Sequence, residues 1–452
     1  MTNIHPSWKQ VGDHFEQEYG FQEQLYANIA VPPGQRGLFL GGSYVSFKYT
    51  GAEKDVTPLF RQAWVQMRHR YPAIAASATK RGKVYKSPNK KELEEWLEHT
   101  FKVSPEKTSA ELFRDMRKTT HVTLNYLPEC NELFMQSEHL HLDGGGVMCL
   151  WDDFFQAVVA PKEVVFGDEV PRLPPRSDDL LDLKEKTPGR GQEVAMSMLA
   201  PLDVGEGEAI CMPVDVTRAP SRCFTAEYKF DLRTSTAILQ ACKNRQVTVT
   251  AAWHAAMAIA TRNVQAGVTG RPGTKFAGFT NFNLRGYFPK SADSYTGTVG
   301  NHYTILPFVV EPEAYSFDET ARRLTAFYRR GLNGQPDIWA ALQPMIETVF
   351  PDVTAPLTDT TPAVSSLGNI SQFIRTKYGS EWEIRDVWAA DTVTGPWIDC
   401  FLWAWRDKLV ICSSYNTGFY TPGDVEGFNE KIAYELMQGL GLYDQPPISR
   451  LI

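Results

Sequence analysis

Cysteine is scarce in this 452-residue chain: the seven that it has are scattered, and no two are spaced as CxxC. That pattern fits reduced thiols better than a disulfide framework or a structural zinc site built on paired cysteines. Long apolar runs are also missing, because the stretch 251–260 is interrupted by His254 and is far shorter than the ~20 residues that span a bilayer. The N-terminal residues MTNIHPSWKQ have no basic or apolar region of the kind found in signal peptides. We therefore expect a cytoplasmic protein with reduced thiols and no membrane partner.

Clustered positive charge is absent as well. The chain has 46 basic and 53 acidic side chains, a net charge of −7, and no run of Lys or Arg. Nucleic acid is therefore not expected as the main partner, since backbone binding needs clustered cations. The chain has no Walker P-loop, no GxGxxG and no GxSxG elbow, which argues against those phosphate-binding loops and against a covalent serine intermediate. Aromatic residues, in contrast, make up 12% of the chain, which suits a large core or an apolar cavity.

Helix and strand patterns alternate along two parts of the chain, and between them proline and glycine accumulate while apolar periodicity fades. This favours an α/β (α+β) protein of two halves, residues 1–165 and 222–452, joined by a connector at 166–221. Helical spacing is found at 56–70, 91–99, 109–118, 147–158, 234–242, 250–263, 317–330 and 422–439. Strand-like patterns are found at 122–127, 132–142, 222–230, 276–284, 302–310, 382–390, 397–405 and 408–415.

One segment, SEHLHLDGGG at 137–146, concentrates titratable side chains. On a strand, His139, His141 and Asp143 share one face. Solvated histidines on an edge strand are one interpretation. A metal site is a second, because HxHxD opens the motif of metallo-β-lactamase-type hydrolases, but position 144 is Gly and the complete ligand set that a metal centre needs is missing, so we expect no metal. General-base catalysis by His139, with Asp143 four residues on, is the third.

The third interpretation gains support from a series of companion motifs. His139 to Gly144 follow HxxxDG, which resembles the acyltransferase superfamily that includes chloramphenicol acetyltransferase, the plant BAHD acyltransferases and the condensation domains of peptide synthetases. The companions follow in the family's order and span about residues 56 to 432. They are YPAI at 71–74, VTAAWHAA at 249–256, NFNLR at 281–285 with Pro289, VGN at 299–301, SSLG at 365–368 and the hairpin at 407–415.

Two departures narrow the resemblance. Glu138 stands where condensation domains have the first His of HHxxxDG, while His139 keeps the second, catalytic one. The BAHD motif DFGWG is absent, and DTVTGPWID at 391–399 occupies roughly its place. The landmarks are nearest to fungal secondary-metabolite acetyltransferases such as the trichothecene O-acetyltransferases.

The resemblance implies two chloramphenicol-acetyltransferase-like halves, each a mixed sheet with flanking helices, and an active-site tunnel between them. His139 would remove the proton of an acceptor, which suits an imidazole with an ordinary pKa of about 6.5. Asp143 would form a structural salt bridge to Arg285. The transfer would be direct, with acetyl-CoA as co-substrate, no permanently bound cofactor, and a hydroxyl of an apolar, terpenoid-like secondary metabolite as acceptor. We expect a monomer.

Two alternatives to the acetyl-CoA enzyme stay open. One is a condensation-like enzyme that uses a carrier-bound thioester or is repurposed for cyclisation, and the other is a non-catalytic protein whose tunnel only holds a ligand.

The remaining site residues are predicted from their residue type and their position in the sequence. Arg271 and Lys275 are candidates for binding the phosphates of coenzyme A. Candidates for the tunnel wall are His141, Gly144, Gly145, Ser365, Ser366, Asn369 and Trp397, with the two serines and Asn369 also as oxyanion donors.

Overall fold

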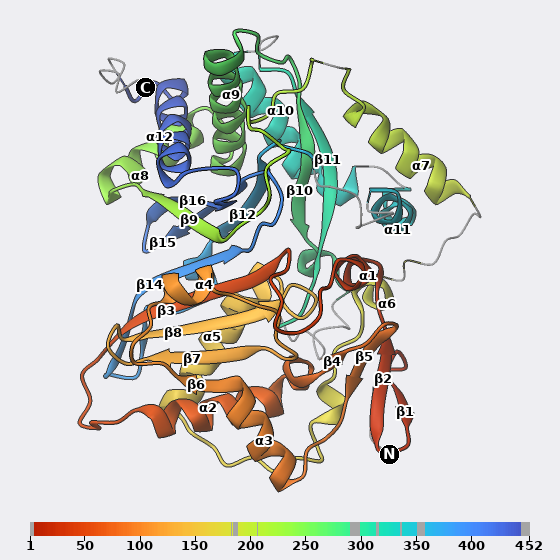
Figure 1. Cartoon of the computed structure of the whole chain (residues 1–452), viewed down its shortest axis with the longest axis vertical. Helices are drawn as coiled ribbons and strands as arrows, with labels where there is room; N and C mark the ends of the chain where they lie inside the picture. Colours follow the sequence, from red (N-terminus) through yellow and green to blue (C-terminus); the bar gives the residue numbers. More distant parts are fainter. Residues whose placement is uncertain are drawn as a thin grey trace.

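The chain folds around two six-stranded mixed sheets and one small four-stranded sheet (Figure 1). The computed structural model describes residues 4–181, 183, 189–205, 207–289, 299–312, 316–334, 337–349 and 358–443. Helices flank the two large sheets, as predicted, and the aromatic residues supply much of the buried core of the first lobe. Within the described residues, no helix is long and apolar enough to cross a membrane.

The first lobe contains the sheet β13-β14-β3-β8-β7-β6, in which all pairs are antiparallel except β6 with β7. Helix α5 (Gly144–Val159) packs against α2 (Thr57–Arg70), and its predicted apolar face is buried. The strands are β3 (Leu40–Tyr49), β6 (Phe101–Val103), β7 (Thr123–Leu127), β8 (Glu132–Glu138), β13 (Lys377–Tyr378) and β14 (Trp382–Asp391). Two further helices of this lobe are α3 (Lys90–Thr100) and α4 (Ser109–Arg114).

The second lobe contains the sheet β11-β10-β12-β15-β16-β9, with parallel pairing of β10 with β12 and of β12 with β15. The alanine-rich helix α9 (Val249–Thr269) is buried along most of its length and contacts α10 (Phe317–Arg330) and α12 (Pro422–Gly439). The strands are β9 (Cys223–Lys229), β10 (Phe276–Asn283), β11 (Tyr303–Val310), β12 (Ala363–Asn369), β15 (Asp399–Trp405) and β16 (Lys408–Asn416), and the fourth helix is α8 (Leu232–Asn244).

Strand β14 connects the two lobes, because it belongs to the second half of the sequence but pairs with β3 in the first sheet. The chain therefore enters the first sheet again after residue 222 (Figure 1). This crossover brings the C-terminal end of β14 and the start of β15 to the boundary between the sheets.

A third cluster of apolar side chains lies beside this boundary, where α11 packs against α1 and α7. The predicted connector at 166–221 thus contains an ordered helix, α7, which the weak periodicity had not indicated. The elements of this region are β1 (Lys9–Val11), β2 (His14–Glu18), α1 (Phe21–Asn28), β4 (Ser77–Ala78), β5 (Gly82–Tyr85), α6 (Ser177–Leu180), α7 (Arg190–Leu199) and α11 (Ile338–Val349).

Candidate active site

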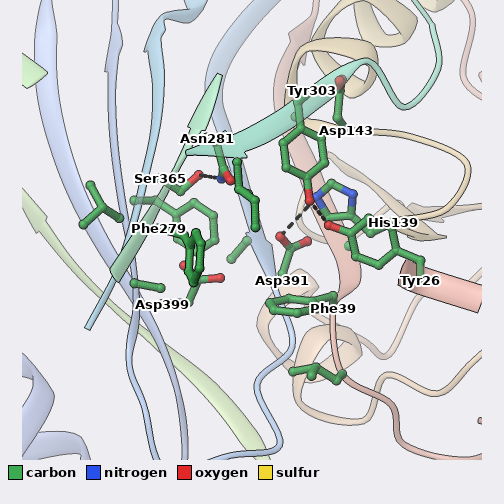
Figure 2. A pocket seen from close by; sticks show the side chains of 18 of the residues that line it. Tyr26, Phe39, His139, Asp143, Phe279, Asn281, Tyr303, Ser365, Asp391 and Asp399 are labelled. Atoms are coloured by element: carbon green, nitrogen blue, oxygen red, sulfur yellow. Dashed lines mark hydrogen bonds and ion pairs between the residues drawn. The ribbon is translucent and has the colours of Figure 1, made fainter. Parts of the chain in front are cut away.

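A cavity of about 1260 Å³ lies between the two large sheets and is lined by both lobes. The first lobe contributes the ends of β8 and β14 and the start of β3, and the second lobe contributes β10, β11, β12 and β15. Figure 2 shows that His139 and Asp391 face this space from the first lobe, while Phe279, Ser365 and Asp399 face it from the second.

His139 occupies the wall of the cavity with its imidazole held from two sides. The ring stacks on Tyr26, with centroids 4.6 Å apart and planes at 8°, and Tyr303 packs against it at 5.2 Å. The Nε2 atom lies 3.7 Å from Oδ2 of Asp391. The Nδ1 atom is buried and has no hydrogen-bond partner among the described residues. Nε2 is therefore the only ring nitrogen that a ligand in the cavity can reach.

The local backbone differs from the predicted strand at 132–142. Strand β8 ends at Glu138, and Asp143 becomes the N-cap of α5, accepting a hydrogen bond from the Gly146 amide. His139 and His141 consequently point to different places. His141 is buried away from the cavity, its Nε2 hydrogen-bonded to the Ala76 carbonyl, and burial lowers its pKa to about 4. Its predicted place in the tunnel wall is wrong for a geometric reason: the strand period stops before it.

Asp143 is held by four hydrogen bonds. The Arg285 guanidinium donates from Nη1 and Nη2 at 2.8 and 2.9 Å, and the amides of Gly146 and His302 donate at 2.7 and 2.8 Å. Burial by itself would raise the pKa of Asp143, but the Arg285 charge and these donors hold it below its ordinary value. The predicted pair of Asp143 and Arg285 is therefore formed, and it ties the start of α5 to the second lobe.

The glycines after Asp143 are required by packing. A Cβ atom on Gly146 would lie 2.7 Å from the Gly300 carbonyl oxygen, and one on Gly144 would lie 2.4 Å from Cδ2 of Leu367. Gly144 and Gly145 both line the cavity. The close approach of the two lobes at this point thus explains why small residues follow the motif.

The predicted residues of the second lobe divide into two groups. Ser365 and Trp397 line the cavity, and the Ser365 hydroxyl accepts a hydrogen bond from Nδ2 of Asn281 at 3.3 Å, which leaves its proton free to donate. Ser366 also lines the cavity, but its hydroxyl is hydrogen-bonded to Thr250. Asn369 is exposed and accepts from the Ser371 amide, so it lies outside the lining.

The two predicted phosphate-binding residues are unequal in position. Lys275 lines the cavity and forms an ion pair with Glu208 at 2.9 Å, whereas Arg271 is exposed and is not part of the lining. A different cation, Arg36, also lines the cavity.

Four important lining residues were missed in the sequence: Tyr26, Tyr303, Asp391 and Asp399. The hydroxyls of Tyr26 and Tyr303 are hydrogen-bonded to each other, and burial raises the pKa of both phenols, so both stay protonated. Burial also raises the pKa of Asp391, against the opposing effect of His139. The sequence did contain a signal for the two aspartates: one ends an apolar strand, and the other begins the next strand.

The potential metal ligands do not gather in this cavity. In the part of the chain that the structure describes, one group of three lies within coordinating reach, His69, Asp168 and Glu169, and none of the three lines the cavity. His139, His141 and Asp143 each have a different partner and do not form a common ligand set, which argues against the interpretation of HxHxD as a metal site.

Comparison with solved structures identifies the architecture. The trichothecene 15-O-acetyltransferase TRI3 from Fusarium sporotrichioides superposes with a TM-score of 0.82 at 17% identity, covering 96% of this chain and 98% of its own. The epimerization domain of the third module of tyrocidine synthetase B superposes with a TM-score of 0.60 at 14% identity, covering 98% of this chain and 99% of that domain. The chain therefore shares the two-lobe fold of these acyltransferase-like and condensation-like proteins, as predicted.

Sequence relatives address the enzyme class. No protein-family profile matches the chain. The acetyltransferase pigO of Monascus ruber is 26% identical over 98% of this chain and 100% of its own length. The O-acetyltransferase pigM of the same organism is 24% identical over 82% of this chain and 74% of its own length. These relatives, together with the shared fold, confirm the predicted class of enzyme, an acyltransferase.

Proposed function

We propose that the protein is an acyl-CoA-dependent O-acyltransferase that acetylates a hydroxyl of an apolar secondary metabolite, such as a terpenoid-like alcohol. The observation that carries the proposal is His139, whose one accessible nitrogen faces a large cavity between the lobes. The names of the relatives, which are acetyltransferases and a trichothecene O-acetyltransferase, support the acyl group and the class of acceptor.

The reaction follows from the position of Nε2. The acceptor hydroxyl gives its proton to Nε2 of His139 while its oxygen forms a bond to the thioester carbon. The carbonyl oxygen takes the displaced electron pair, and the Ser365 hydroxyl donates a hydrogen bond to it, supported by Asn281. As the oxyanion collapses, the carbon–sulfur bond breaks, and the imidazolium returns its proton to the departing thiolate. The products are the ester and free CoA.

Asp391 contributes to the same step through charge. Its carboxylate is 3.7 Å from Nε2, so it lies beside the positive charge that forms on His139 when the acceptor loses its proton. With an effective dielectric constant of about 20, such a pair attracts by about 4 kcal/mol before desolvation is counted. Asp391 therefore steadies the imidazolium, and the partial exposure of the pair to the cavity reduces the effect.

Binding of a polyanionic donor by a protein of net charge −7 requires local cations. Arg36 lines the cavity, and Arg222 lies near it, because both arginines pair with the Asp115 carboxylate, at 3.8 Å and 3.7 Å; these two residues form a small arginine cluster. We assign the CoA phosphates to this arginine cluster rather than to Lys275, whose charge is balanced by Glu208. Arg36→Ala should then raise the KM for acetyl-CoA more than Lys275→Ala does. The reverse order would indicate that Lys275 binds the phosphates.

The function is tested by incubating the protein with acetyl-CoA and a panel of terpenoid alcohols, while thiol release and ester formation are measured. We expect ester and thiol in equal amounts, and no acetylated protein by intact-mass spectrometry. Turnover only with an acetylated carrier protein would favour the condensation-like alternative. Protection against heat by acetyl-CoA without any product would favour a binding protein.

A further inference from the structure

A second acidic side chain, Asp399, lies in the cavity without a partner. It begins β15, its residue is 6% exposed, and its carboxyl belongs to the cavity lining. No hydrogen bond or ion pair to this carboxyl exists among the residues that the structure describes. A buried polar group without a partner is costly, and such groups in a cavity are commonly satisfied by a ligand.

The position of Asp399 relative to His139 indicates which ligand this is. Nε2 of His139 faces Asp391, so the reacting hydroxyl of the acceptor must lie beside Asp391. Seen from His139, Asp399 lies beyond Asp391 in the same cavity (Figure 2), and the negative charge of Asp391 acts on its carboxyl group. The acceptor is therefore the substrate that extends from His139 past Asp391 toward Asp399.

The surroundings of Asp399 are apolar. Phe401 follows Asp399 by two residues on β15 and therefore shares its face, and Phe279 and Trp397 line the same cavity. The cavity is large enough for a ring system as well as a donor arm. A carboxyl group set among aromatic rings fixes the orientation of an otherwise apolar ligand, because only one polar group of that ligand can satisfy it.

We propose that Asp399 forms a specificity subsite for a second oxygen function, a hydroxyl or a keto group, on the acceptor. The acceptor class is thus a rigid, multiply oxygenated alcohol, and Asp399 selects which of its hydroxyls reaches His139. The assignment deepens the proposed function and rests on it. Burial, together with the charge of Asp391, raises the pKa of Asp399 well above its ordinary value, which favours the neutral carboxyl, a group that both donates and accepts a hydrogen bond.

The test compares Asp399→Leu and Asp399→Asn on matched ligands. The probes are rigid terpenoid diols, the mono-ols that lack one hydroxyl, and the corresponding amino alcohols. We measure binding by calorimetry in the presence of CoA, and kcat/KM with acetyl-CoA. Asp13→Asn, whose carboxylate is exposed on the turn between β1 and β2, is the matched control.

The subsite predicts that wild type prefers diols over mono-ols by about tenfold or more in both binding and kcat/KM. Asp399→Leu should abolish this preference, while Asp399→Asn, whose amide also donates and accepts, should keep most of it. Equal binding of diols and mono-ols by wild type overturns the subsite. If wild type prefers amino alcohols and Asp399→Asn removes that preference, the subsite binds an ammonium group of the acceptor, and the assignment to a hydroxyl or keto group is wrong.

Three further outcomes separate the acceptor subsite from donor binding and from the enzyme class. If Asp399→Leu raises only the KM for acetyl-CoA, the carboxyl binds the donor arm and the assignment to the acceptor is wrong. If acetyl transfer proceeds but discrimination is unchanged in Asp399→Leu, the subsite fails while the proposed function stands. If diols bind selectively but wild type transfers no acetyl group, the proposed function fails while the subsite stands.

Discussion

Removal of the Asp143 carboxylate should be among the most damaging single changes to this fold. Asp143→Ala deletes two charge-assisted bonds to Arg285, the N-cap of α5 and the acceptor for the His302 amide. It also leaves a guanidinium with only 14% side-chain exposure without this carboxylate. Breaking a buried ion pair from one side costs about 3–5 kcal/mol of unfolding free energy, and that range includes the loss of the cap, about 1 kcal/mol.

Urea denaturation, followed by fluorescence, measures this cost. Asp143→Asn, Arg285→Gln and the double variant Asp143→Asn/Arg285→Gln are measured in the same way for comparison. Asparagine still caps α5, so Asp143→Asn should cost less than alanine. The double variant should cost at least about 1 kcal/mol less than the sum of the single changes, because neither lone charge remains. The exposed Lys91–Glu95 pair supplies the control, and Glu95→Ala should cost less than about 1 kcal/mol.

The pH dependence of the variant adds a second readout. Because the pKa of Asp143 is below its ordinary value in the folded protein, its contribution is complete above the unfolded pKa of about 3.9 and is lost as the pH falls through the folded value. The cost of Asp143→Ala should therefore be constant between pH 5 and pH 7. Stability of Asp143→Ala within about 0.5 kcal/mol of wild type, or strict additivity with Arg285→Gln, would refute the claim that this pair ties the two lobes together.

Further predictions concern the site and its buried histidines. Asp391→Asn should lower kcat by about tenfold to a hundredfold without a change in the KM for acetyl-CoA, because the imidazolium loses its counter-charge; an unchanged kcat would contradict this role. Ser365→Ala should lower kcat by about 10²-fold through loss of an oxyanion donor, and a pure rise in KM would argue against it. Burial lowers the pKa of His141 to about 4 and that of His302 to about 3, so the unfolded chain takes up these protons first as the pH falls from about 6.5. The unfolding free energy should consequently fall between pH 6.5 and pH 4, by up to about 3 kcal/mol for His141, and urea midpoints that do not change across this interval would contradict the assignment.

Much of the architecture was predictable because local patterns and tertiary structure agree. The sequence itself marks the start of α12, with Thr421 as the N-cap and Pro422 in the first turn. The apolar face of α5 is likewise visible in the spacing of apolar residues at 147–158. The hairpin of β15 and β16 is likewise evident, because two short strand-like runs are separated by the turn at Arg406 and Asp407. Among the elements that the sequence patterns missed, the helices α1, α7 and α11 are stabilised by packing against one another, which no single segment reveals.

The site was predictable only where one motif carries it. His139, Asp143 and Arg285 follow from HxxxDG and its companions, but the place of His141 was wrong because the strand ends at Glu138 to let Asp143 cap α5. Asp391 could not be assigned to the site from sequence, since it comes near His139 only through the return of β14 to the first sheet, a long-range pairing. Asp399 could not be assigned either, because it lines the same cavity from β15 of the second sheet. Tyr26 is brought to His139 by the packing of α1, which leaves no periodic signal.

The kcat of His139→Ala tests the central claim most directly, measured as thiol release from saturating acetyl-CoA in the presence of an acceptor that wild type acetylates. Because Nε2 is the proposed base, kcat should fall by about 10²–10⁴-fold while the KM for acetyl-CoA and the thermal midpoint stay close to those of wild type. His99→Ala, at an exposed histidine on α3, should leave all three unchanged. A folded His139→Ala variant that keeps the wild-type kcat would contradict general-base catalysis by this residue.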